Sequence, residues 1–217
     1  MKFLSSIKKK SLEKETVLLR VDFNVEKFEN SLRFETAIPT IEWLLAHNAK
    51  IVLLSHRGRP NGIEKNLSLA SLIPFLSKRL SRQINFIDNF NFEDAKAFIK
   101  ATESGALFML ENLRFNAEEE ANDYQFAKKL TSLGTMFVND AIAVSHRKNA
   151  SIVAITKYLP SYAGLLFEKE FKALNNLIKK PARPLVLIIG GAKTSDKTPI
   201  IKKFIKKADL FLLGGGV

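Results

Sequence analysis

Short runs of apolar residues alternate with amphipathic stretches along most of this chain. The apolar runs predict strands at residues 17–25, 51–54, 84–87, 106–110 and 136–138. The amphipathic stretches predict helices at about residues 39–47, 69–79, 92–100 and 123–133. Buried strands that alternate with helices are typical of a parallel sheet covered on both faces. We therefore predict an α/β fold of three layers, a Rossmann-like parallel sheet with helices on both faces.

The pattern changes in the last quarter of the chain. A longer helix is predicted at residues 163–180, with Phe167, Phe171, Leu174 and Ile178 forming one apolar stripe. A strand, a helix and a strand follow at residues 185–189, 199–207 and 210–213. We expect Ile200, Ile201, Phe204 and Ile205 to face inward from that helix. Such a small unit has no core of its own, so we expect it to open a second α/β domain; the alternative is that its strands extend the first sheet.

Polar side chains gather where the predicted strands end. They are Asp22 and Asn24 after the first strand, His56 and Arg59 after the second, Arg114 after the fourth and Arg147 after the fifth. Ligands bind outside the carboxyl ends of parallel strands, and Arg pairs bidentately with phosphate or carboxylate. Each residue alone is consistent with a turn, a cap or a solvated surface. Their coincidence at four strand ends favours a site for a small molecule with several negative charges.

A second cluster follows the strand at residues 185–189. It contains Gly190, Gly191, Lys193 and Lys197 and precedes a predicted helix. Glycines let backbone N–H groups approach an anion, and a helix N-terminus favours phosphate. The spacing is not that of a Walker A loop, and a tight turn with solvated lysines is the alternative. Gly214, Gly215 and Gly216 form a similar glycine segment after the last strand.

Composition narrows the choice of partners and chemistry. The 217 residues contain 34 Lys and Arg against 22 Asp and Glu, a formal net charge of +12, which indicates anionic partners. The absence of Cys excludes disulfides, Cys-ligated metals and thiol catalysis. No apolar run is long enough for a signal peptide or a membrane span. We expect a cytoplasmic protein with no membrane partner.

Taken together, these motifs resemble those of the phosphoglycerate kinase family. The resemblance rests on collinear stretches: Arg-Val-Asp-Phe-Asn-Val at 20–25, Arg33 with Pro-Thr-Ile at 39–41, Ser-His-Arg-Gly-Arg-Pro at 55–60, Leu-Glu-Asn-Leu-Arg-Phe at 110–115, Val-Asn-Asp-Ala at 138–141, His-Arg at 146–147, Ala-Gly at 163–164 with Glu-Lys-Glu at 168–170, the glycine and lysine segment at 190–197, and Asp209 with the glycines at 214–216. They cover essentially the whole chain in the order and spacing of the family.

The resemblance implies two Rossmann-like domains and a glycolytic kinase that uses ADP and ATP. Residues 1–162 would form the substrate domain, residues 163–180 the interdomain helix and residues 181–217 the truncated start of a nucleotide-binding domain. The implied reaction is reversible phosphoryl transfer between 1,3-bisphosphoglycerate and ADP, giving 3-phosphoglycerate and ATP. Mg²⁺ would be carried by the nucleotide rather than by a site of the protein. The implied protein is a monomer.

The resemblance also implies roles for individual residues. The substrate-binding residues would be Asp22, Asn24, Arg33, His56, Arg59, Arg114 and Arg147. The nucleotide-binding residues would be Gly190, Gly191, Lys193, Lys197, Gly214 and Gly215. Arg33, Lys193 and Lys197 would be catalytic by stabilising the transferred phosphoryl group.

Two further expectations concern the extent and the charge of the chain. Members of the family are much longer, so we expect an incomplete form that transfers no phosphoryl group alone. The alternative function is a non-catalytic fragment that binds anions or nucleic acid through its basic surface, since residues 168–207 hold 11 Lys and Arg against 3 Asp and Glu. Nucleic acid would also favour interleaved aromatic residues, whereas Phe171 and Phe204 lie on predicted buried stripes. We therefore expect no nucleic-acid partner.

Overall fold

The computed structural model describes residues 1–7, 12–25, 31–191, 195 and 197–215. It divides into two compact units, Met1–Glu170 and Phe171–Val217. The boundary falls inside the long helix α6 (Leu165–Lys179). The division at residues 162 and 180 stays a prediction. No helix in the described part of the chain is long and apolar enough to cross a bilayer.

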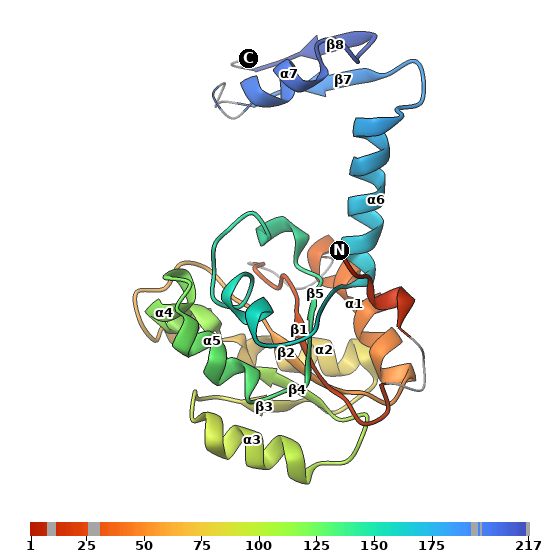
Figure 1. Ribbon diagram of the computed structural model, residues 1–217. Coiled ribbons are helices and arrows are strands. Elements are labelled where there is room, and N and C mark those ends of the chain that lie inside the picture. Colours follow the sequence, from red (N-terminus) through yellow and green to blue (C-terminus); the bar gives the residue numbers. More distant parts are fainter. Residues whose placement is uncertain (8–11, 26–30, 192–194, 196, 216–217) are drawn as a thin grey trace. The chain divides into compact units, whose positions relative to one another are not determined.

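The first unit is built on a six-stranded parallel sheet, as the apolar runs predict (Figure 1). Its strands lie in the order β3-β4-β2-β1-β5-β6. They are β1 (Thr16–Arg20), β2 (Lys50–Leu54), β3 (Asn85–Ile87), β4 (Leu107–Leu110), β5 (Met136–Asn139) and β6 (Ser161–Ala163). The four strands with site candidates at their ends, β4, β2, β1 and β5, are therefore consecutive neighbours.

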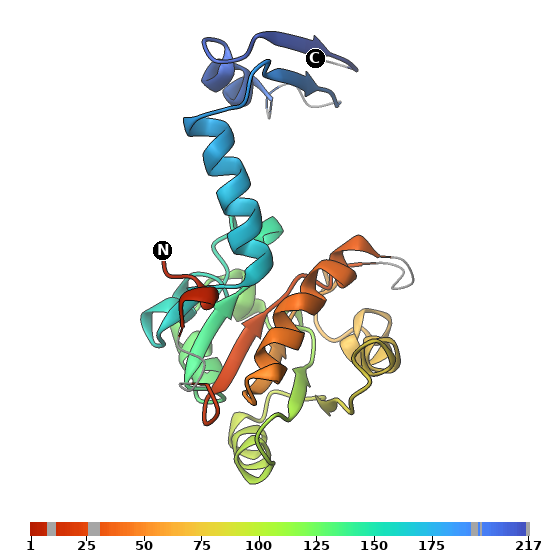
Figure 2. The same ribbon diagram turned by 90° about the vertical axis from the view of Figure 1, so that its right-hand side faces the viewer.

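Helices cover both faces of this sheet (Figures 1 and 2). The α-helices are α1 (Leu32–Ala46), α2 (Ile73–Leu80), α3 (Phe92–Ala101), α4 (Ala117–Glu120) and α5 (Tyr124–Thr131). Short 3-10 helices connect them: η1 (Leu4–Ser6), η3 (Lys65–Leu67), η4 (Leu69–Leu72), η5 (Leu113–Phe115), η6 (Ile142–Val144) and η7 (Ala154–Lys157). Alternate residues of β1 serve the two cores: Leu19 packs with α1 and α2, and Leu18 packs with α3 and α5. The predicted three-layer architecture is confirmed.

Two predicted elements differ clearly from the structure, and one observed strand was not predicted. β1 ends at Arg20 rather than at residue 25, because the backbone N–H of Phe23 bonds to the Ser55 hydroxyl instead of a strand partner. α1 begins at Leu32 and contains Pro39, whose missing N–H costs one helical bond while the apolar face of the helix is buried. β6 has no apolar run and was not predicted. It is fixed by its pairing with β5.

The second unit contains a separate two-stranded parallel sheet, so its strands do not extend the first one. Its strands are β7 (Val186–Ile189) and β8 (Leu210–Leu213), with helix α7 (Thr198–Phe204) between them. Phe204 is buried as predicted, but Ile200 and Ile205 are exposed, because α7 ends at Phe204 and two strands cover only part of it. The Lys207 ammonium donates a hydrogen bond to the Ile178 carbonyl.

Candidate functional site

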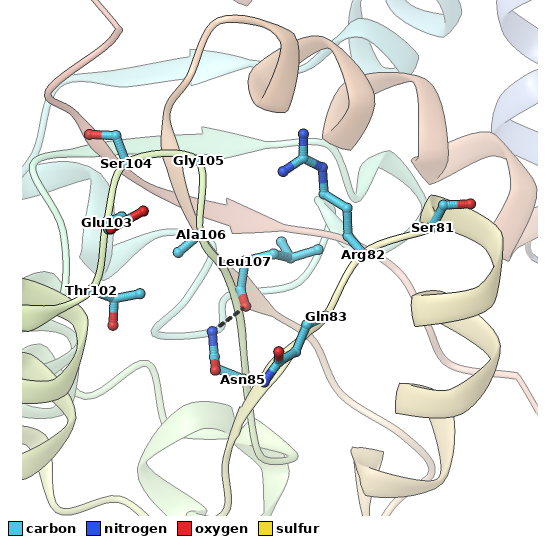
Figure 3. Close-up of a pocket in the computed structure, with 10 residues that line it drawn as sticks. All are labelled: Ser81, Arg82, Gln83, Asn85, Thr102, Glu103, Ser104, Gly105, Ala106 and Leu107. Atoms are coloured by element: carbon cyan, nitrogen blue, oxygen red, sulfur yellow. Dashed lines mark hydrogen bonds between the residues drawn. The ribbon is translucent and has the colours of Figure 1, made fainter.

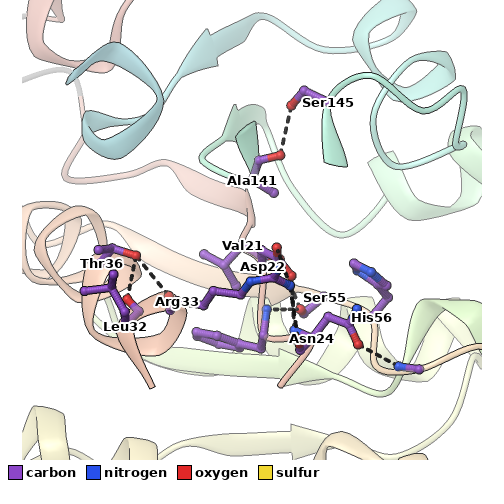
Figure 4. A network of polar contacts seen from close by, with 12 residues as sticks. Val21, Asp22, Asn24, Leu32, Arg33, Thr36, Ser55, His56, Ala141 and Ser145 are labelled. Carbon is purple, nitrogen blue, oxygen red and sulfur yellow. Dashed lines mark hydrogen bonds and ion pairs between the residues drawn. The ribbon is translucent and has the colours of Figure 1, made fainter. Parts of the chain in front are cut away.

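Asp22, Asn24 and Arg33 form one corner of the cluster at the carboxyl edge of the sheet (Figure 4). The Arg33 guanidinium lies 3.3 Å from the Asp22 carboxylate and donates to the Asn24 carbonyl at 3.2 Å. Asp22 is buried, whereas the Arg33 side chain is half exposed at 53%. Asp22 also accepts the backbone N–H of Asn24 at 3.1 Å. The carboxylate thus orients a cation that remains accessible to a ligand.

The loop after β2 is bound to this corner through Gly58. Its N–H donates to the Asn24 side-chain oxygen at 2.8 Å, and its carbonyl accepts from the Arg114 guanidinium at 2.6 Å. Gly58 has φ +64°, and an added Cβ would lie 2.8 Å from the Leu67 side chain, so the turn requires glycine. Gly58 therefore joins the ends of three strands.

Glu111 and Asn112 support the same loop rather than facing a ligand. The Glu111 carboxylate accepts from Ser68 and from the N–H of Leu69. The buried Asn112 side chain donates to the carbonyls of Arg57 and Leu67. These two residues hold the segments after β2 and before α2 together.

Arg114 is the buried cation of the cluster. Its Nε lies 3.0 Å from the Glu120 carboxylate, and burial lowers its pKa, partly offset by Glu120. The positive charges of Arg147 and Arg59 lower the pKa further, which places both within electrostatic reach. Among the residues that the structure describes, the side chains of Arg59 and Arg147 form no hydrogen bond or ion pair. Both are available to an anion.

His56 lies at the end of β2 and is almost fully buried, at 1% exposed. Its Nδ1 is 2.9 Å from an N–H of Arg20, and its Nε2 has no hydrogen-bond partner among the described residues. Burial lowers the His56 pKa from 6.5 to about 2, reinforced by the positive charges of Arg20, Arg114, Arg147 and Arg33. His56 is therefore a neutral imidazole at physiological pH.

Arg20 was not predicted as part of the site, although it lies under it. Its side chain is 2% exposed, donates from Nε to Ser151 at 2.9 Å and from Nη1 to the Val21 carbonyl at 2.6 Å. Ser151 in turn donates to the buried Glu119 carboxylate at 2.6 Å. The signal in the sequence was a charged residue between Leu19 and Val21, inside an apolar run that predicts a buried strand.

Asp140, after β5, binds the start of α6 rather than a ligand. Its carboxylate accepts the backbone N–H of Phe167 at 3.0 Å. Burial raises the Asp140 pKa. The neighbouring His146 is exposed. At the end of β5, Arg147 is thus the residue that takes part in the electrostatics of the cluster.

Two hollows border the cluster. One, of about 90 Å³, is lined by Asp22, Arg33 and Asp140, and the other, of about 440 Å³, by Asn24 and Gly58. A further hollow of about 630 Å³ lies at the opposite edge of the sheet, before β3 and β4 (Figure 3). It is lined by exposed polar residues such as Arg82 and does not belong to the cluster.

The glycine segments of the second unit meet each other at the carboxyl ends of β7 and β8. A Cβ on Gly190 would lie 3.6 Å from the Gly214 carbonyl oxygen, and one on Gly215 would lie 3.3 Å from the Gly191 N. Gly191 has φ +124°, which an L side chain rarely adopts. Lys197 lies beside it, with Cε 3.5 Å from the position of a Gly191 Cβ. The predicted Lys193 lies outside the described residues.

Metal-ligating groups are not clustered in the described part of the chain. No set of three or more His, Asp or Glu side chains there could hold a metal ion.

Comparison with known proteins gives one consistent result. The family model described as phosphoglycerate kinase matches residues 7–217. Among curated proteins, the chain is 42% identical to a phosphoglycerate kinase of Wolbachia pipientis wMel, over 99% of this chain and 55% of that protein. It is 41% identical to that of Coprothermobacter proteolyticus, over 99% of this chain and 56% of that protein. The chain thus spans about half the length of the curated relatives it matches.

Solved structures agree with the sequence matches. Phosphoglycerate kinase from Pyrococcus horikoshii OT3 superposes with a TM-score of 0.87 at 32% identity, over 99% of this chain and 55% of that one. The enzyme from Coxiella burnetii gives a TM-score of 0.84 at 34% identity, over 98% of this chain and 54% of that one. The likeness extends over both described units.

Proposed function

Since the chain belongs to the phosphoglycerate kinase family, we propose that its first unit binds the glycerate substrate of a phosphoryl-transfer reaction. The proposed reaction exchanges a phosphoryl group between 1,3-bisphosphoglycerate and ADP, giving 3-phosphoglycerate and ATP. The proposed substrate-binding residues are Asp22, Asn24, Arg33, His56, Arg59, Arg114 and Arg147. The chain spans about half the length of its curated relatives, so the activity is proposed as that of a family member of full length.

One observation carries the proposal: Arg cations and a neutral imidazole lie with the buried Asp22 carboxylate at one sheet edge. A glycerate phosphate has an anionic group at each end and a hydroxyl between them, so it needs several cations and an acceptor. The side chains of Arg59 and Arg147 have no hydrogen-bond or ion-pair partner among the described residues and can take the anionic ends. Asp22 is placed to accept a hydroxyl proton while it orients Arg33.

The second unit supplies the features that a nucleotide phosphate requires. We propose that Gly190, Gly191, Gly214 and Gly215 present backbone to the phosphates of ADP or ATP, with Lys193 and Lys197 as point charges. Mg²⁺ belongs to this proposal as part of the nucleotide co-substrate and supplies positive charge at the phosphates. Arg33, Lys193 and Lys197 are the proposed catalytic residues, since phosphoryl transfer depends on positioning and on stabilising developing negative charge.

Calorimetric titration of the 217-residue chain with 3-phosphoglycerate tests the substrate site. We expect saturable binding that weakens at least about tenfold in Arg33→Ala and in Arg147→Ala, because each removes a charge-assisted hydrogen bond. Arg82→Ala is the matched control, since it removes an exposed arginine from the opposite sheet edge. Equal loss in all three variants, or no binding by the unsubstituted chain, would refute the site. Affinity for a single-stranded oligonucleotide should change little in Arg33→Ala and Arg147→Ala if the basic surface binds nucleic acid separately.

A coupled assay with ATP and 3-phosphoglycerate tests the activity of this chain by itself. We expect no turnover, because the strands of the second unit expose much of their apolar surface, with Ile188 at 80%. Substantial turnover by the purified chain would contradict this expectation.

A further inference from the structure

We infer that Arg20, through its contact with His56, is a positioning residue that fixes His56 as a neutral donor in the anion site. Arg20 is too deeply buried to touch a ligand, yet its Nη2 lies 2.9 Å from His56 Nδ1. The inference rests on the proposed function for the identity of the ligand. It assigns Arg20 a role that acts through another side chain.

The contact determines which imidazole nitrogen carries the proton. An arginine guanidinium has N–H donors and no acceptor, so the nitrogen facing it must accept. His56 Nδ1 therefore holds a lone pair, and the single proton of the neutral ring lies on Nε2. The Nε2 atom is buried and has no hydrogen-bond partner among the described residues. The arrangement leaves an N–H donor without a protein acceptor.

Arg20 is itself held in place by partners other than His56. Ser151 accepts from Arg20 Nε and donates to Glu119, whose other carboxylate oxygen accepts the Ser151 N–H at 3.0 Å. The Val21 carbonyl takes a further Arg20 donor. The buried charges of Arg20 and Glu119 thus balance through Ser151, and the Nη2 donors of the guanidinium remain for His56.

The charges around His56 explain why a neutral donor is needed here. Arg20 of β1, Arg33 of α1, Arg114 of η5 and Arg147 all act on the imidazole, and each disfavours its protonation. Asp22 and Glu119 act on Arg20 in the opposite sense, by favouring its charged form. A protonated His56 would turn an N–H towards Arg20, so the pair would repel. His56 therefore adds a hydrogen bond for an anionic oxygen without adding a titrating charge.

Nitrogen-15 NMR of the free 217-residue chain tests the assignment without any ligand. Long-range ¹H–¹⁵N spectra should show His56 as the Nε2–H tautomer, unchanged between pH 5 and pH 8. The His56→Gln variant identifies the signal by its loss. A proton on Nδ1, or titration of His56 within this range, would overturn the inference even if 3-phosphoglycerate binds.

Two variants then test whether the effect passes through Arg20. In Arg20→Met, Nδ1 no longer faces a donor, so the Nδ1–H tautomer should become populated, and affinity for 3-phosphoglycerate should fall at least about tenfold. Ser151→Ala is the control for damage to the buried network, since it leaves the Arg20 contact with His56 and should keep the Nε2–H tautomer. An unchanged tautomer and an unchanged affinity in Arg20→Met would refute the positioning role.

Arg20→Lys provides the rescue and covers the case in which Arg20→Met does not fold. Lysine keeps a donor and a charge, so the Nε2–H tautomer should persist although packing changes. Loss of the tautomer in this variant, with the fold intact, would count against the inference. Failure of 3-phosphoglycerate to bind the unsubstituted chain would refute the proposed function, while the tautomer of the free chain still decides the role of Arg20.

Discussion

The two units use the same local pattern of strands and helix but bury very different amounts of it. In the first unit, central strands such as β2 lie between two helical layers, and Ile51 to Leu54 are fully buried. In the second unit, alternate residues of both strands are open to solvent: Val186 at 42%, Ile188 at 80%, Leu210 at 51% and Leu212 at 46%. Only Leu185, Ile189 and Phe204 are buried among its described apolar residues.

This difference shows that an apolar strand is not by itself a stable element. Both sheets are parallel and both have continuous apolar strands. The first has enough neighbouring strands and helices to remove those residues from water, whereas the two strands of the second are joined by one short helix, α7. Hydrophobic stabilisation follows the area buried rather than the number of apolar residues. We therefore expect the first unit to carry nearly all of the stability of the chain.

Hydrogen exchange should show the largest contrast. Amides of β2 should exchange only on global opening, whereas those of β7 should exchange through local opening. With a global stability of about 5 kcal/mol or more, protection factors should differ by at least about 10³. Site-resolved exchange by NMR at pH 7 measures both strands in one sample. Comparable protection of β2 and β7 would contradict the conclusion that the second unit is less stable than the first.

A matched pair of substitutions should show an intermediate contrast. Ile51→Ala removes a fully buried side chain from β2 and should lower the free energy of unfolding by about 2–5 kcal/mol. Ile188→Ala makes the same chemical change at an exposed position of β7 and should alter it by less than about 0.5 kcal/mol. Urea unfolding followed by circular dichroism measures both. A large loss in Ile188→Ala would mean that β7 is covered in solution.

The pH dependence of stability should show the smallest contrast. Because the His56 pKa is lowered from 6.5 to about 2, the unfolded chain binds a proton below pH 6.5 that the folded chain does not. The free energy of unfolding should therefore fall with acidification, by at most about 1.4 kcal/mol per pH unit from this residue. His56→Gln should flatten the slope between pH 7 and pH 5. An unchanged slope would show that His56 is not held neutral.

Among the described residues of the second unit, Asp209 is the titratable group whose pKa is shifted. Its pKa is lowered by the hydrogen bond with Arg183 and by the Leu185 N–H, so its contribution is present above pH 3.8 and lost below. The pair is solvent-exposed, so Asp209→Asn should leave the urea midpoint unchanged. The effect should instead appear as a shift of the Leu185 amide resonance. A lowered midpoint would show that the second unit unfolds with the first.

The periodicity of apolar residues predicted the elements that are fully buried. It failed for elements whose position depends on contacts between segments distant in the sequence. β4 and β5 are continuous apolar runs, and α5 begins at an Asp123 cap, so their sequences suffice. β6 carries a serine and a tyrosine and is defined only by its neighbour β5. The inward face expected for α7 was wrong at Ile200 and Ile205, because periodicity assumes a partner surface wide enough to cover a whole stripe.

The candidate site was predictable to the extent that topology brings strand ends together. The parallel sheet places Asp22, His56 and Arg114 on one edge, which follows from strand order alone. The support beneath them was not predictable, since Glu119 and Ser151 lie far from Arg20 in sequence and nothing in their spacing connects them. Whether the cluster binds 3-phosphoglycerate stays a proposal.

The buried arginine of β1 also has a consequence for how the sheet is assembled. Residues of β1 alternate between the two cores, so a slip of one residue against β2 would turn every side chain to the opposite face. Arg20 would then leave Ser151 and His56 and enter the apolar layer beneath α1, where an unpaired charge costs several kcal/mol. A leucine would stay in an apolar layer after such a slip, whereas the Arg20 guanidinium would lose its partners. We therefore expect Arg20 to favour the observed register of β1 against β2 over a register shifted by one residue.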